Sequence, residues 1–90
     1  MSGVRDNAAL SRFEMDTDSD VAFARYRREG GSIVITHVET PAALRGHGVA
    51  SNLMEGALGL IRRDGLKVVA ACSFARAYLA EHPEYSDLKP

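Results

Sequence analysis

The chain of 90 residues has no tryptophan, a single cysteine, three prolines and no long apolar run. One cysteine cannot form a disulfide within the chain, which excludes a small disulfide-stabilised scaffold and suits a reducing compartment. No stretch approaches the roughly 18 apolar residues that a membrane-spanning helix requires, and no apolar signal core follows Met1. We therefore expect a cytoplasmic protein that has no membrane partner.

An excess of charge is also missing, because 11 basic and 12 acidic residues leave a net charge of −1. This balance gives no global attraction to nucleic acid, and we expect no nucleic-acid partner. The local cluster Arg25, Arg27 and Arg28 is explained equally well as a solvated strand edge. The three histidines and the cysteine lack the spacing of metal ligands, so no metal is expected. A hydrophobic content of 46% excludes a disordered chain.

The first half of the chain shows the alternation of β-strands. Residues 1–9 are small and polar without a period, which predicts a frayed start, followed by one domain over residues 10–90. A turn cluster at 17–20 and the pair Gly30-Gly31 separate three alternating segments. The sequence therefore predicts three antiparallel strands. These strands are expected at 10–16, 21–29 and 32–39.

The period of the apolar residues changes from two to 3.6 after Pro41. Apolar side chains from Ala50 to Ile61 recur at helical spacing, which predicts an amphipathic helix packed on the sheet. Gly65 fits the residue that follows the end of such a helix. The helix is thus a crossover between two strands.

The last quarter of the chain predicts one more strand and one more helix. Residues 67–72 form a short apolar run, and Ser73 is expected to cap a helix that reaches about His82. A right-handed crossover sets the last two strands parallel. We predict an α+β fold of order β-β-β-α-β-α, with a mixed, mainly antiparallel four-stranded sheet and two helices.

The loop Arg45-Gly46-His47-Gly48-Val49-Ala50 is the sharpest local motif. It joins a predicted strand to the start of a helix, where unsatisfied N–H groups and the helix dipole favour an anion. Glycines let the backbone approach a phosphate closely, and Arg45 adds a positive charge. The alternative is an ordinary turn in which the glycines only permit the bend.

The spacing of Arg45, Gly48 and Ala50 matches Gln/Arg-x-x-Gly-x-Gly/Ala and resembles the acyl-CoA loop of the GNAT superfamily of N-acetyltransferases. Segments 65–69, 72–74 and 82–88 look like a minimal branch of that superfamily. The resemblance implies a GNAT-like fold and transfer of acetyl from acetyl-CoA to a primary amine. The acceptor stays open between a small molecule and a protein.

The resemblance also implies a cofactor site. Backbone groups of the third strand would bind the pantetheine arm, N–H groups of residues 46–50 would hold the pyrophosphate, and the thioester would lie between the last two strand ends. The cofactor-binding residues expected on this basis are Val38, Glu39, Thr40, Arg45, Gly46, His47, Gly48, Val49, Ala50, Ser73 and Phe74.

Four side chains are candidates for catalysis. Cys72 lies at a helix start, where thiolate is favoured, so an acetyl-Cys72 intermediate is one route; a small buried thiol is the alternative. His37 and Glu39 share one strand face, and either is a candidate base. Tyr78 is a candidate acid toward the leaving thiolate, or a core aromatic.

Two other functions compete with an acetyltransferase. The chain could be a non-catalytic module that binds CoA or acyl-CoA, because it is short for an enzyme with an acceptor site. It could also be a protein-interaction domain without a nucleotide. Both a monomer and a homodimer are compatible with so small a domain.

Overall fold

The computed structural model describes residues 3–18 and 20–90. Five strands and two helices follow one another along these residues, together with short 3₁₀ turns at Ala8–Leu10, Ala42–Leu44 and Pro83–Leu88. The elements are β1 (Val4–Asn7), β2 (Arg12–Asp16), β3 (Val21–Glu29), β4 (Ser32–Glu39), α1 (Val49–Arg63), β5 (Lys67–Ala70) and α2 (Ser73–Glu81).

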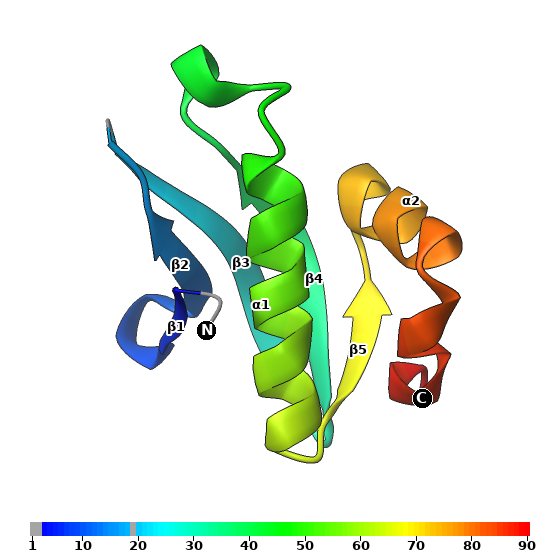
Figure 1. Cartoon of the computed structure of the whole chain (residues 1–90). Coiled ribbons are helices and arrows are strands. Elements are labelled where there is room, and N and C mark those ends of the chain that lie inside the picture. The colour runs from blue at the N-terminus through cyan, green and yellow to red at the C-terminus, as the bar shows by residue number, and fades with distance from the viewer. Residues whose placement is uncertain (1–2, 19) are drawn as a thin grey trace.

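The strands form one sheet in the order β1-β2-β3-β4-β5, as Figure 1 shows. Neighbours are antiparallel except β4 and β5, which are parallel and joined by the crossover helix α1. The predicted mixed, mainly antiparallel α+β fold is therefore confirmed. The strand count differs, because the described residues contain five strands where four were expected.

The additional strand is β1, and the expectation of a frayed start over residues 1–9 is wrong for Val4–Asn7. Polar side-chain contacts to neighbouring strands hold this segment in place. Arg5 pairs with the buried Glu14 at 3.0 Å, Asn7 Nδ2 donates to the same carboxylate at 3.1 Å, and the Tyr26 hydroxyl donates to Asp6 at 2.7 Å. Polar side chains thus order a segment that has no apolar period. Residues 1 and 2, and Ser19 of the turn cluster, lie outside the described residues.

Helix α1 covers one face of the sheet and supplies much of the core (Figure 1). Its apolar stripe falls where the 3.6-residue period predicted it, and Leu53, Met54, Leu58 and Ile61 are fully buried. Each such side chain contributes about 1.5–3 kcal/mol by leaving water. None of the helices in the described residues is long and apolar enough to cross a membrane.

A β-bulge at Thr36 interrupts β4. Arg25 and Tyr26 are adjacent on β3, but their partners His37 and Ile35 are two residues apart on β4, so Thr36 is the additional residue. The Thr36 hydroxyl donates to the Arg25 carbonyl at 3.2 Å. Side chains before and after the bulge therefore alternate with opposite phase.

The C-terminal end of α1 is closed by the tail of the chain. Gly65 adopts a φ of +71°, and the N–H of Leu66 donates to the Ile61 carbonyl, which ends the helix where the sequence predicted. Arg62 donates to both Asp87 oxygens and to the Glu84 carbonyl. These contacts keep the tail against the helix.

Candidate functional site

The β4–β5 pair has an open end, opposite the C-terminal end of α1, where the two strands separate. The ladder ends at Ile35 and Ala70, and the last bond runs from Ala71 N–H to the Ile35 carbonyl. Beyond this point β4 continues to Glu39, whereas the segment that follows β5 turns away into α2 (Figure 1). Strand β5 is thus shorter than the predicted 67–72, and a gap opens between the two strand ends.

The bulge decides which backbone groups of β4 face this gap. Within one strand, residues whose side chains share a face also turn their N–H and C=O groups to the same side. Val38 packs against the core cluster that contains Ile33 and Ile35, and Ile35 directs its carbonyl toward β5. Val38 therefore presents its backbone N–H and C=O to the gap.

The start of α1 lies at the same open end and has no cap. Its N-cap residue Gly48 has a φ of +78°, no side chain bonds the first turn, and that turn contains no acidic residue. In the described part of the chain, the N–H groups of Val49, Ala50 and Ser51 have no acceptor, because the first bond runs from Asn52 to the Gly48 carbonyl. Such a helix start favours an anion.

A pocket of about 230 Å³ lies in front of these N–H groups. A Cβ at Gly46 or Gly48 would enter open space, so both glycines leave the approach to the backbone free, and their φ values of +84° and +78° disfavour other residues. Among the predicted residues, Thr40, Arg45, Gly46, Gly48, Val49, Ala50 and Phe74 line this pocket. The sequence analysis missed Leu44 and Ser51, which also line it.

Four predicted cofactor residues are not part of this pocket lining, and one of them, Glu39, lines the second pocket described below. His47 donates its backbone N–H to the Leu44 carbonyl at 3.1 Å, so it has no free N–H for a phosphate. Val38 faces the strand gap as described above. Ser73 begins α2 but does not cap it. The anion cradle therefore lacks the His47 N–H that residues 46–50 were expected to supply.

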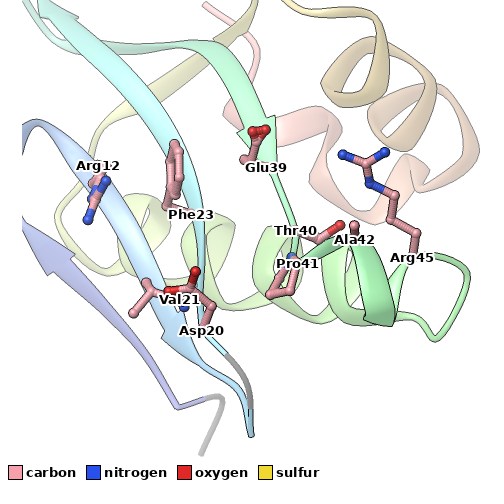
Figure 2. Close-up of a pocket in the computed structure, with 9 residues that line it drawn as sticks. All are labelled: Arg12, Asp20, Val21, Phe23, Glu39, Thr40, Pro41, Ala42 and Arg45. Atoms are coloured by element: carbon pink, nitrogen blue, oxygen red, sulfur yellow. Dashed lines mark hydrogen bonds between the residues drawn. The ribbon is translucent and has the colours of Figure 1, made fainter.

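A second pocket of about 450 Å³ adjoins the first, because Thr40 and Arg45 line both. Figure 2 shows its side chains: Arg12, Phe23 and Glu39 stand on three neighbouring strands, and Asp20 lies at the start of β3. It lies on the open face of the sheet, opposite α1. Its remaining lining residues are Val21, Pro41 and Ala42.

Glu39 and His37 occupy this open face as the sequence predicted. Their side chains are about half exposed, and His37 Nε2 lies 3.5 Å from Glu39 Oε1. Glu39 lines the larger pocket, whereas His37 packs beside Phe23 with ring centroids 6.2 Å apart. Glu39 is thus the candidate base that reaches the pocket.

Cys72 caps α2, where the sequence analysis expected Ser73 to do so. Its sulfur accepts from the Ala75 N–H at 3.4 Å, which is possible because residue 72 has the extended backbone of an N-cap. The thiol is half buried and packs against the core. The structure therefore places Cys72 at a helix start near the strand gap.

Tyr78 lies in the core rather than in either pocket. It is 6% exposed and stacks on His82 with ring centroids 3.9 Å apart. Burial raises the pKa of Tyr78 to about 12, and the neighbouring Tyr85 and Glu55 add to the rise. This environment fits the core alternative weighed for Tyr78.

No group of three or more His, Cys, Asp or Glu in residues 3–18 and 20–90 is arranged to hold a metal ion.

A comparison of the sequence with models of known protein families identifies the family of this chain. A family model described as GCN5-related N-acetyl-transferase matches residues 12–88. The chain belongs to the GCN5-related N-acetyltransferase family. The resemblance inferred from the glycine loop is confirmed.

Individual known proteins are also similar to the chain over most of its length. Protein NATD1 of Gallus gallus and that of Homo sapiens are each 35% identical over 65 residues, which is 71% of this chain. The match spans 59% and 58% of these relatives, so it covers about three-fifths of their length. The solution structure of a GCN5-like protein from Staphylococcus aureus aligns with all of the chain and 91% of its own, with a TM-score of 0.69 and 25% identity.

Proposed function

We propose that the protein binds acetyl-CoA at the open end of β4 and β5 and transfers the acetyl group to a primary amine. The uncapped start of α1 carries this proposal, because free N–H groups, two glycines in left-handed conformation and Arg45 converge on one pocket. Family membership supports the same function. The pocket residues fit a diphosphate, since neither a side-chain cap nor a carboxylate competes for the helix start.

The described residues have distinct roles in this proposal. The N–H groups of Val49, Ala50 and Ser51 bind the pyrophosphate, and Arg45 neutralises its charge. The backbone of Val38 lies in the strand gap, where its N–H can donate to the thioester oxygen. Phe74 forms one wall of the pyrophosphate pocket. Acetyl-CoA supplies an activated acetyl group as a thioester.

In the direct route, Glu39 removes a proton from the acceptor ammonium, so that the amine has a free electron pair. The new N–C bond forms as the C–S bond breaks, the nitrogen loses its second proton as the amide forms, and the thiolate that leaves takes up this proton through water. His37, 3.5 Å from Glu39, is placed to pass the removed proton to solvent. The Val38 N–H stabilises the negative charge that develops on the oxygen.

In the alternative route, the Cys72 sulfur bonds to the acetyl carbon as the C–S bond to CoA breaks, and CoA leaves with the proton of the Cys72 thiol; the amine then attacks acetyl-Cys72, and the released thiol regains a proton from the nitrogen. The position of the thiol at the start of α2, where its sulfur accepts from the Ala75 N–H, supports this route. Mass measurement after incubation with acetyl-CoA separates the routes. The covalent route requires an acetyl adduct that Cys72→Ser abolishes together with turnover.

Calorimetric titration with acetyl-CoA tests the proposal through a matched pair of variants, Gly48→Asp and Gly48→Asn. Both side chains tolerate the left-handed backbone, and they differ only by one negative charge at the proposed phosphate site. We expect Gly48→Asp to weaken binding at least about tenfold more than Gly48→Asn.

Three results distinguish the alternatives. Absence of binding by the unmodified chain at millimolar acetyl-CoA would overturn the proposal and leave an interaction domain. Binding without release of CoA by any amine would indicate a non-catalytic module. Equal weakening by Asp and Asn would show that the loop conformation matters and that the helix start does not hold the phosphate.

A further inference from the structure

We infer that the larger pocket selects an acceptor that carries a second positive charge, namely an aliphatic diamine or a longer polyamine. This inference rests on the proposed acetyltransferase function, and it names the substrate class. The pocket of about 450 Å³ adjoins the cofactor cradle through Thr40 and Arg45 and contains Glu39, so an amine bound there lies next to the candidate base.

Two carboxylates of this pocket have no lysine or arginine partner within residues 3–18 and 20–90. The Asp20 carboxylate accepts from the backbone N–H of Val21 at 2.8 Å, whereas the Asp20 carbonyl accepts from Thr17. Glu39 has His37 alone, at 3.5 Å. Both groups line the same hollow as Phe23, with Glu39 to the right of the Phe23 ring and Asp20 below it in Figure 2. Two unpaired anions in one pocket favour two ammonium groups over one.

The two cations that also line the pocket are already engaged. Arg12 pairs with the buried Glu14 and lies 4.5 Å from the centroid of the Phe23 ring. Arg45 belongs equally to the phosphate cradle. Once the cradle holds its diphosphate, the carboxylates dominate the charge of the remaining pocket.

The Arg25 guanidinium lies near the pocket but is not part of its lining. It matters because a nearby cation would favour an acceptor with a second negative charge instead of a second positive one. It lies 5.5 Å from the centroid of Phe23, on the exposed part of the sheet face. An acceptor with a carboxylate instead of the second amine would pair with this group. Arg25 is, however, not among the residues that line the pocket, whereas Asp20 is. The position of Asp20 therefore favours a second ammonium.

The spacing of the carboxylates sets the length of the acceptor. Glu39 is paired with Phe23, and Asp20 lies just before β3, three residues ahead of Phe23, a stretch that spans at most about 10 Å. Each ammonium lies about 3 Å from its carboxylate. An extended chain of about five carbons between two nitrogens fits between them. The side chain of Phe23 offers an apolar surface to that chain.

Release of CoA from acetyl-CoA, followed through its thiol, tests the inference with three acceptors of equal length: 1,5-diaminopentane, pentylamine and 5-aminopentanoate. We expect kcat/KM for the diamine to exceed that for pentylamine about fivefold, as for a partly exposed ion pair, and to exceed that for 5-aminopentanoate by more. Asp20→Asn should remove the advantage of the diamine and leave pentylamine unchanged. Asp18→Asn, two residues away in the same turn, should keep it.

Equal use of diamine and monoamine by the unmodified chain would overturn the inference, as would an Asp20→Asn variant that slows both alike. NMR titration of 1,5-diaminopentane into the full chain, alone and with CoA, provides a measurement that does not depend on turnover. We expect the amide signals of Val21, Phe23 and Glu39 to shift. If acetyl-CoA binds but these signals do not shift with the diamine, the inference is overturned and the proposed function is not. If the diamine binds but acetyl-CoA does not, the proposed function alone is contradicted.

Discussion

The two ends of the parallel β4–β5 pair differ in how completely their polar groups are satisfied. At the closed end, Lys67 N–H donates to the Gly31 carbonyl, and Arg62 holds the tail through Asp87. At the open end the strands separate after Ile35, and the start of α1 keeps free N–H groups. The difference indicates that the closed end stabilises the fold and the open end binds.

Leaving such groups unpaired costs stability unless water or a bound molecule pairs with them. In a chain of 90 residues the buried core is small, so few unsatisfied groups are affordable. Their concentration at one end, next to two pockets, separates binding residues from stabilising residues. The following predictions address this separation, from the largest expected effect to the smallest.

At the open end, Glu39→Gln should lower kcat about 100-fold or more, because the variant has no carboxylate to remove the proton of the acceptor. The affinity for acetyl-CoA, measured by calorimetry, should stay unchanged, since the cradle does not include this side chain. Raising the pH should recover part of the activity by deprotonating the amine in solution. A variant with full activity at neutral pH would contradict the role of Glu39, and His37→Gln then tests the other candidate base.

At the closed end, Leu88→Ala should lower the free energy of unfolding by about 2–3 kcal/mol without changing the affinity for acetyl-CoA. Leu88 is 3% exposed and belongs to the core cluster, so the shorter side chain leaves a cavity. Urea unfolding gives the free energy, and Lys89→Ala, an exposed neighbour, serves as the control. A loss of acetyl-CoA affinity at full stability would show that the two ends are not separate.

The smallest expected effect is on how the free energy of unfolding depends on acidic pH. Hydrogen bonds from Arg62 hold the pKa of Asp87 below its usual range. A lowered pKa in the folded state means that the pair stabilises the fold at neutral pH, and that this contribution is lost as the pH falls through the pKa of the folded state. Urea unfolding should therefore show that the free energy of unfolding falls more steeply at low pH for the unmodified chain than for Asp87→Asn. Added salt should reduce the difference, because the pair is exposed; identical pH profiles would contradict this contribution.

Much of the fold could be predicted from periodicity and turn residues. The bounds of β3 and β4 follow from alternation and from Gly30-Gly31, and the core stripe of α1 follows from its 3.6-residue period. Strand β1 could not be predicted in this way, because its stability depends on polar contacts with Glu14 and Tyr26 that lie in other strands.

The candidate site could be predicted only where its residues are close in sequence. The loop around Gly48 carries its own signal, whereas Asp20 and Phe23 reach the site through strand pairing. The hairpin alone pairs Glu29 with Ser32, and that register continued would set Glu39 opposite the buried Ala22. The bulge sets it opposite Phe23 on the open face instead. A bulge leaves no mark in the alternation of a strand as short as β4.

Thr40 and Arg45 line both pockets, so events in one pocket change the energy of binding in the other. Where Arg45 is drawn toward a diphosphate, the neighbouring pocket loses positive charge and attracts cations more strongly. If the proposed function holds, thermodynamic linkage requires the reverse, so that a cationic acceptor would tighten the binding of acetyl-CoA by the same factor. Two residues shared by two walls are thus sufficient for cooperativity between substrates within a single small domain.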